Sequence, residues 1–266
     1  MVHWDRFVGY CHFIGILCRS LGLFGAFAYI VQRIRTRLML LRRPYVLFSK
    51  DARHGLACRP GTSDIYVFQQ IYVTREYSCL DHLKDDSCLI VDCGANVGYS
   101  SAYFLSRFPS SYVISVEPDP GNFEALEQNL APYAGRYRAI RSAVWSEQLG
   151  LVLGETPRSG QEWARQVRPA LPGEKASMQA IDIGTLLKDS GFARIRILKI
   201  DIERAEAAVF SANYESWLAN VDNMVIELHG KECRDIFLKA IATESFDVSE
   251  CGELTVCKRL GQLGQS

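Results

Sequence analysis

The chain has 266 residues, 48% of them hydrophobic and 23% charged, and its formal net charge at pH 7 is zero. These values are typical of a globular protein and exclude a disordered or fibrous one. The length is sufficient for one α/β domain with a large core and an N-terminal extension. The charge is unevenly distributed, because residues 1–60 contain ten Lys or Arg against two Asp, which gives this segment +8.

The N-terminal segment is apolar and basic. Phe7 to Val31 is largely apolar, Arg19 lies near its middle, and five arginines follow it. A membrane-spanning helix needs about 20 nearly uninterrupted apolar residues, so Arg19 argues against one. We therefore expect an extension of one or two accessory helices over residues 1–58. Peripheral contact with an anionic membrane surface and a transmembrane anchor stay open as alternatives.

The cysteine pattern indicates a reducing compartment, and the arginine pattern argues against nucleic-acid binding. The nine cysteines are odd in number and contain no C-x-x-C, which favours free thiols in a reducing cytosol. The expected localisation is cytoplasmic, with the inner face of the membrane as the alternative. The N-terminal arginines are not interleaved with aromatic residues, so no nucleic-acid partner is expected.

From Leu89 onward, strand patterns alternate with helix patterns. This alternation predicts an α/β fold with a doubly wound, mostly parallel sheet. The two runs at the end, separated by a Cys-Gly-Glu turn, predict an antiparallel hairpin. Residues 154–176 are rich in Gly, Pro and charge and predict a long loop or excursion. The predicted strands are Leu89–Cys93, Tyr112–Glu117, Tyr137–Val144, Ile195–Ile200, Asn223–Leu228, Phe246–Cys251 and Leu254–Lys258, and the predicted helices are Ser100–Arg107, Asn122–Leu130, Ile181–Lys188 and Ala205–Phe210.

The first predicted strand runs into a turn of small residues, read as D-C-G-A-N-V-G. Gly94, Asn96 and Gly98 stand at every second position after Asp92. Glycine, and less readily asparagine, adopts left-handed backbone conformations, so such a turn brings backbone N–H groups close to a ligand. Glu117 ends the second strand about twenty residues later, where a carboxylate can bind both ribose hydroxyls.

Two cofactor classes fit a turn of this kind. A dinucleotide fold typically has G-x-G-x-x-G and a pyrophosphate at the helix N-terminus. Here an acid precedes the first glycine by two residues, which suits the ammonium group of S-adenosylmethionine, reached by Asp92 directly or through water. Ser142 and Ala143 end the third strand and form a plausible wall for adenine. We therefore favour the methyl donor.

Four stretches resemble the FkbM family of S-adenosylmethionine-dependent methyltransferases: VDCGANVGYSS, SVEPDPGNFEALEQN, LKIDIERAE and IELHG. The resemblance covers about Arg59 to Gly230, so residues 59–266 are expected to form a class I methyltransferase domain. It implies a seven-stranded sheet of order 3-2-1-4-5-7-6 and methyl transfer to a hydroxyl of a sugar, glycan or secondary metabolite. Carried over motif by motif, it implies a methionine site at Asp92, Gly94, Asn96 and Gly98, a ribose site at Glu117, and an adenosine end shaped by Pro118 and Asn122.

Acidic residues end the fourth and fifth predicted strands. Asp201 is expected to be a site residue that contributes to cofactor binding and catalysis, and the candidate general bases are Asp201, Glu203, Glu206, Glu227 and His229. His229 has the ordinary pKa best matched to neutral pH. Lys199 is expected to pair with Glu203 or Glu227. No metal is assigned, although Asp201, Glu227 and His229 form an alternative O/O/N site for a divalent cation that binds a substrate diol.

One position departs from the family pattern. Where the family has glycine in LKIDVEGAE, this chain has Arg204. The expected function is methyl transfer, and the alternative is a catalytically weakened S-adenosylmethionine-binding protein that serves as a partner or scaffold.

Overall fold

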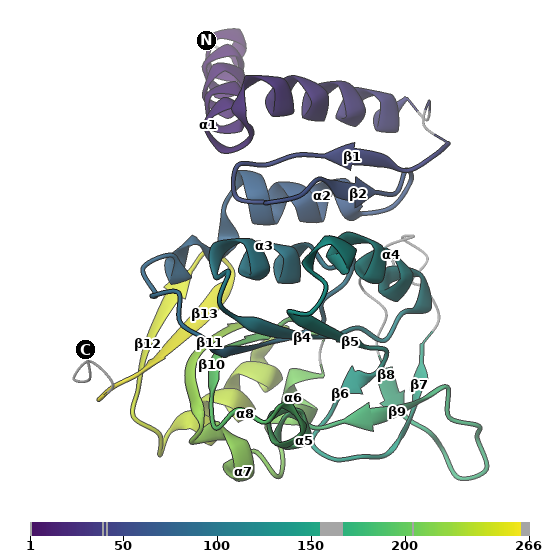
Figure 1. Ribbon diagram of the computed structural model, residues 1–266, viewed down its shortest axis with the longest axis vertical. Helices are drawn as coiled ribbons and strands as arrows, with labels where there is room; N and C mark the ends of the chain where they lie inside the picture. The colour runs from purple at the N-terminus through teal and green to yellow at the C-terminus, as the bar shows by residue number, and fades with distance from the viewer. Residues whose placement is uncertain (1, 39, 41, 155–166, 204, 262–266) are drawn as a thin grey trace. The chain divides into compact units, whose positions relative to one another are not determined.

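The computed structural model describes residues 2–38, 40, 42–154, 167–203 and 205–261. The chain divides into two compact units, residues 1–83 and 84–266 (Figure 1). The boundary between the units thus follows Leu83, whereas the sequence analysis ended its extension at residue 58. Residues 59–83 belong to the first unit because the turns after its hairpin pack against its long helix.

The first unit is a long helix, a short hairpin and a series of helical turns (Figure 1). Helix α1, Val2–Arg37, is broken at Gly22, whose φ of 75° and ψ of 170° are not helical. Tyr29 is fully buried, stacks on Phe68 and donates a 2.8 Å hydrogen bond to Gln69 Oε1. The remaining elements are β1 Tyr45–Leu47, β2 Leu56–Cys58, α2 Asp64–Phe68, the π-helical turn η1 Gln69–Val73 and the 3-10 turn η2 Glu76–Leu80.

The segment His12–Arg37 of α1 is long and apolar enough to cross a membrane by length and composition, with a mean hydropathy of 1.8 over its most apolar window. Part of the segment also packs within the first unit, and 28% of that window is buried. Leu17, Leu21 and Ala26 are buried, and the Arg33 guanidinium donates to Tyr29 and to Gln69. These contacts agree with the expected accessory helices.

The second unit contains a seven-stranded mixed sheet (Figure 1). The strand order is β12-β13-β11-β10-β3-β4-β5, in which β3, β4, β5, β10 and β11 pair in parallel and β13 pairs antiparallel to both β11 and β12. Numbered along the chain from the β5 edge, these strands run 3-2-1-4-5-7-6. The bounds are β3 Leu89–Cys93, β4 Tyr112–Val116, β5 Tyr137–Ile140, β10 Ile195–Ile200, β11 Val221–Glu227, β12 Phe246–Cys251 and β13 Leu254–Arg259.

Helices cover both faces of this sheet, as expected for an α/β fold (Figure 1). On one side lie α3 Tyr99–Arg107, α4 Pro120–Leu130 and the 3-10 turn η3 Ala131–Tyr133, and on the other α5 Ile183–Ser190, α6 Glu206–Val209, α7 Glu215–Leu218 and α8 Lys231–Ile241. The sequence analysis did not expect α8, although Cys233, Phe237, Ala240 and Ile241 recur at helical spacing and are buried. Phe237 meets Phe210 edge-to-face at 5.0 Å in the core.

A second, four-stranded sheet of order β6-β9-β7-β8 corrects two expectations (Figure 1). Its strands are β6 Ala143–Val144, β7 Gly150–Leu153, β8 Val167–Pro169 and β9 Met178–Ile181. The expected strand Tyr137–Val144 is divided at residues 141–142, because Ser142 Oγ donates to Gln179 O and the chain turns to pair with β9. Part of the expected loop 154–176 forms β8, and residues 155–166 of that loop lie outside the described residues.

Candidate functional site

The turn between β3 and α3 has the left-handed conformations that its sequence indicates. The φ angles are 79° at Gly94, 49° at Asn96 and 81° at Gly98. The expectation that Asn96 takes the place of a middle glycine is therefore confirmed. The N–H groups of Gly94 and Ala95 both donate to Val116 O at 3.0 Å, which attaches the turn to the end of β4.

Asp92 and Lys199 form a buried ion pair beneath this turn. Asp92 is fully buried, its Oδ2 accepts 2.6 Å hydrogen bonds from Ser100 and Ser101, and its Oδ1 lies 3.1 Å from Lys199 Nζ. Lys199 Nζ also donates to Gly94 O at 2.6 Å. Burial acts to lower the pKa of Lys199, but the charges of Asp92 and Asp201 outweigh it and raise that pKa. Lys199 is therefore a permanent cation.

These contacts change the interpretation of both residues. Lys199 pairs with Asp92, and more distantly with Asp201 at 4.0 Å, instead of with Glu203 or Glu227 as expected. The reason is the sheet register, in which Lys199 stands directly beside Asp92 on the neighbouring parallel strand. Asp92 has no exposed surface and holds the turn through these contacts, and its expected contact with the methionine part of a cofactor stays a prediction.

Glu117 lies on the other side of the turn, immediately after β4. Its Oε2 accepts from the Asn96 N–H and its Oε1 from the Asp119 N–H, each at 2.9 Å. Burial raises the pKa of Glu117 to about 7, although these two hydrogen bonds act to lower it. The carboxylate thus connects the glycine turn to the start of α4, the place expected of a ribose-binding acid.

The residues assigned to the adenosine end follow β4 and β5. Asn122 is buried in the first turn of α4, where Asp119 caps the helix by accepting from the Gly121 and Asn122 N–H groups. Ser142 and Ala143 are buried where the chain passes from β5 to β6. Contacts of these three residues and of Pro118 with a cofactor stay predictions.

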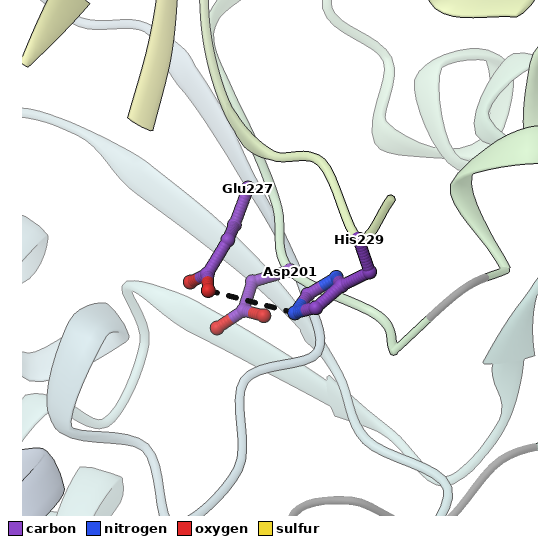
Figure 2. A group of neighbouring side chains, drawn as sticks. All are labelled: Asp201, Glu227 and His229. Atoms are coloured by element: carbon purple, nitrogen blue, oxygen red, sulfur yellow. Dashed lines mark ion pairs between the residues drawn. The ribbon is translucent and has the colours of Figure 1, made fainter. Parts of the chain in front are cut away.

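Three candidate catalytic residues converge beyond the ends of β10 and β11. Figure 2 shows the side chains of Asp201, Glu227 and His229 directed toward one another. One ligand atom from each lies within 4.8 Å of the others. His229 Nε2 is 3.5 Å from Glu227 Oε1 and 3.7 Å from Glu203 Oε1. Glu203, with a left-handed φ of 39°, completes this group, which we call the carboxylate–histidine cluster.

The charges around His229 set its protonation state. Its Nδ1 lies 2.6 Å from Oε1 of Glu206, a carboxylate with no exposed surface. Hydrogen bonds to Glu206 and Glu227 raise the pKa of His229 to about 11, although burial opposes them. A pKa this high makes His229 an imidazolium near neutral pH, and its assignment as a general base stays a prediction.

The carboxylates of the cluster remain as proton acceptors. The Asp201 side chain is 35% exposed, and burial of the rest raises its pKa, with Lys199 opposing and Glu227 adding to the effect. Burial also raises the pKa of Glu203, with His229 opposing. A raised pKa makes a carboxylate a stronger base, which suits removal of a proton from an alcohol.

The two serines that hold Asp92 were not among the residues predicted from the sequence. Ser100 and Ser101 stand eight and nine residues after Asp92, at the start of the helix that follows the turn. The signal was the Ser-Ser pair in the first turn of a helix otherwise rich in aromatic residues. Arg204, the departure from the family pattern, lies outside the described residues.

The fold is α/β with a left-handed glycine turn after the first strand of its large sheet, and sequence comparison identifies the family. The family model described as methyltransferase FkbM domain matches residues 92–250. The chain belongs to the FkbM methyltransferase family.

Individual relatives are more distant. The chain is 29% identical over 201 residues to the antimetabolite synthetase AmbE of Pseudomonas aeruginosa, covering 62% of this chain and 10% of AmbE. It is 24% identical over 193 residues to Methyltransferase 1 of Beauveria bassiana, covering 61% of this chain and 72% of that protein. A crystal structure of methyltransferase FkbM from Methylobacillus flagellatus matches with a TM-score of 0.45 and 15% identity, covering 66% of this chain and 44% of that one. The chain thus spans a tenth of AmbE and less than half of the FkbM structure.

Proposed function

We propose that this protein is an S-adenosylmethionine-dependent O-methyltransferase whose acceptor is a hydroxyl of a sugar, glycan or secondary metabolite. The observation that carries the proposal is that the left-handed turn, Glu117 and the carboxylate–histidine cluster all follow the carboxyl ends of neighbouring strands. Ligands of α/β sheets bind at this edge. Membership of the FkbM methyltransferase family supports the reaction type.

The residues at the turn fit a sulfonium donor. Backbone groups of residues 94–98 line the place for the methionine part, and Glu117 has further lone pairs with which to accept from two ribose hydroxyls. The turn lacks the G-x-G-x-x-G pattern typical of a pyrophosphate site, and the hydroxyls of the two serines that follow Tyr99 at the start of α3 are engaged by Asp92. Bound donor supplies an electrophilic methyl group.

The cluster supplies the acceptor side of the reaction. Displacement at the methyl carbon is in line, so the acceptor oxygen must be aligned and must lose its proton as the new bond forms. Asp201 and Glu203 are the carboxylates that we assign to this proton, because both have a raised pKa and partial exposure. His229, held as a cation, fixes the positions of Glu203 and Glu227.

Donor binding tests the first half of the proposal. Titration calorimetry with S-adenosylmethionine and with S-adenosylhomocysteine should show one site per chain. Glu117→Ala should weaken binding by about 1.5–3 kcal/mol, or about 10- to 150-fold in Kd, as for hydrogen bonds to a charged group. Glu124→Ala, an exposed position on α4, is the matched control and should bind normally. Unchanged binding by Glu117→Ala would refute the ribose role.

Label transfer from the donor to glycans, lipid-linked sugars or secondary metabolites tests turnover. The antimetabolite synthetase among the relatives supports a secondary-metabolite acceptor. The second candidate function, a donor-binding partner without turnover, is favoured by Arg204 in place of the family's glycine. It gains support if the protein binds donor but transfers label only as the Arg204→Gly variant.

We also propose that the protein is cytoplasmic and contacts an anionic membrane surface peripherally. The second half of α1 exposes Phe24 at 93%, Phe27 at 70% and Ile34 at 53% along one side of the helix. Exposed arginines lie beside and after this stripe, which fits the headgroups of anionic lipids. The arginines are Arg35, Arg37, Arg42 and Arg43.

Vesicle sedimentation tests this contact. Vesicles with phosphatidylglycerol should retain the protein, and a Phe24→Ser/Phe27→Ser double variant should release it, whereas vesicles of phosphatidylcholine alone should bind weakly. Extraction by high salt supports peripheral binding. Retention through salt and alkaline carbonate would instead establish a transmembrane anchor.

A further inference from the structure

The carboxylate–histidine cluster contains the ligand types of a metal site. Proton removal by its carboxylates does not by itself require this combination of residues. We propose that Asp201, Glu227 and His229 bind a divalent cation, and that this cation holds the acceptor hydroxyl beside the donor. The cation site stands on the side chains drawn in Figure 2. Its role toward the acceptor rests on the proposed methyl transfer.

The spacing of the three ligand atoms matches a coordination sphere. Metal–oxygen distances of about 2.1 Å for Mg²⁺ and about 2.3–2.6 Å for Ca²⁺ place two ligands on the same ion about 3.0–5.2 Å apart. One atom each of Asp201, Glu227 and His229 lies within 4.8 Å of the others. The three atoms thus lie within the range that the ligands of one ion span.

The surroundings of His229 are those of a metal-binding histidine. Such residues generally present one ring nitrogen to the metal and the other to a carboxylate that fixes the ring. Here Glu206 Oε1 lies 2.6 Å from Nδ1, and Nε2 faces Glu227. Glu206 has no exposed surface, and its Oε2 is buried without a hydrogen-bond partner in the described structure. Nε2 is therefore the ring nitrogen that remains to face a cation.

The charge balance also favours a cation. Asp201, Glu203, Glu206 and Glu227 contribute four formal negative charges around His229. Lys199 is closer to Asp92, at 3.1 Å, than to Asp201, at 4.0 Å, so it offsets only part of this negative charge. A divalent ion would neutralise this excess of carboxylates where the sheet meets solvent.

The ligand set narrows the identity of the ion. The ligand set is two carboxylates and one imidazole, with open positions for water and substrate. It suits Mn²⁺ or Mg²⁺ better than a metal that prefers thiolate ligands, such as Cu⁺. On such an ion an acceptor hydroxyl would become more acidic. With Asp201 among the ligands, Glu203 would be the one of the two proposed bases left to take its proton. A neighbouring hydroxyl could occupy a second open position, so a vicinal diol is the acceptor class that this site fits.

Mn²⁺ alone is the probe for the test, added to the purified full chain without donor or acceptor. Calorimetry and electron paramagnetic resonance should find one bound Mn²⁺ per chain, and electron spin-echo spectroscopy should detect one imidazole nitrogen. Glu227→Gln and His229→Ala should each weaken binding at least about 10-fold, and the nitrogen signal should vanish in His229→Ala. Glu206→Gln should weaken binding by about 10- to 100-fold through the orientation of His229.

Asp189→Asn, an exposed carboxylate in the last turn of α5, is the matched control and should bind Mn²⁺ normally. If Glu206→Gln fails to fold, the partly exposed Glu227→Gln keeps the test decisive. Absence of Mn²⁺ binding, or binding that the ligand variants leave unchanged, overturns the metal site. Donor binding is measured separately, so loss of the metal site alone leaves the proposed methyl transfer standing.

Discussion

At the residue scale, the turn after β3 depends on the absence of a Cβ atom at Gly94. A Cβ at this position would stand 1.8 Å from the carbonyl oxygen of Asp201, and the φ of Gly94 is 79°. The distance of 1.8 Å is far shorter than van der Waals contact. The oxygen belongs to the backbone, which cannot rotate away. A side chain at residue 94 would therefore separate β3 from the chain that follows β10.

Gly94→Ala should destabilise the protein by more than the left-handed backbone alone costs, and should abolish donor binding. Gly135→Ala is the matched control, because Gly135 has a φ of 86° with nothing within 4 Å of an added Cβ. We expect the control to cost about 1–2 kcal/mol and Gly94→Ala distinctly more, as measured by urea unfolding. Equal losses in the two variants would show that the clash with Asp201 is relieved without cost.

Glu117 predicts a pH dependence of stability in the absence of donor. Its pKa in the folded protein is about 7, against an ordinary value of 4.5. Between these values the folded state holds a proton that the unfolded state has released, so the free energy of unfolding falls as pH rises from 4.5 to 7. The contribution of Glu117 is about 3 kcal/mol.

Urea unfolding across this pH range, for the natural protein and for Glu117→Gln, measures that contribution as a difference. The variant should lose most of the fall in stability between pH 4.5 and 7, and the exposed Glu124→Gln should retain it. Identical pH profiles for the natural protein and Glu117→Gln would contradict the raised pKa.

At the scale of elements, the site depends on the pairing of β3 with β10. The parallel register places Lys199 beside Asp92, and the lysine also donates to the Gly94 carbonyl at the start of the turn. Asp92 in turn holds the first turn of α3 through two serines. One buried cation thus connects two strands, the turn and a helix.

Lys199→Met should destabilise the protein by about 3–5 kcal/mol, because it leaves the buried Asp92 carboxylate without its cation. The Lys199→Met/Asp92→Asn double variant should recover part of the lost stability, because it leaves no buried unpaired carboxylate at residue 92. Lys188→Met, on the exposed side of α5, should change the free energy of unfolding by less than about 0.5 kcal/mol. Strictly additive effects of Lys199→Met and Asp92→Asn in urea unfolding would exclude the coupling.

On the scale of the whole molecule, the proposed donor site and the exposed apolar stripe of α1 belong to different compact units. Residues 94–98, Glu117 and the cluster all lie in residues 84–266, and the stripe lies in residues 1–83. A ligand stabilises the unit to which it binds.

Hydrogen exchange with S-adenosylmethionine at about 100 times its Kd should therefore separate the units. Amides of β3, β4 and β10 that exchange by global unfolding should slow by about 100-fold, equivalent to about 2.7 kcal/mol. Amides of α1 and the β1–β2 hairpin should change little. Equal slowing in both units would show that they unfold as one.

Local pattern determined much of this architecture. The alternation of strands and helices from Leu89, the left-handed conformation at Asn96 and the position of Glu117 after the second strand depend on nearby residues and could be predicted from them. The family was also recognisable, because its motifs are continuous stretches of sequence.

Tertiary structure alone decided the contacts between distant segments. Lys199 meets Asp92 because β10 lies beside β3, and His229 is a cation because Glu206 reaches it from the chain after β10. The division of residues 137–144 between two sheets depended on β9, almost forty residues later. The physical reason is that backbone conformation follows neighbours in the chain, whereas charge state, pairing and strand partner follow neighbours in space.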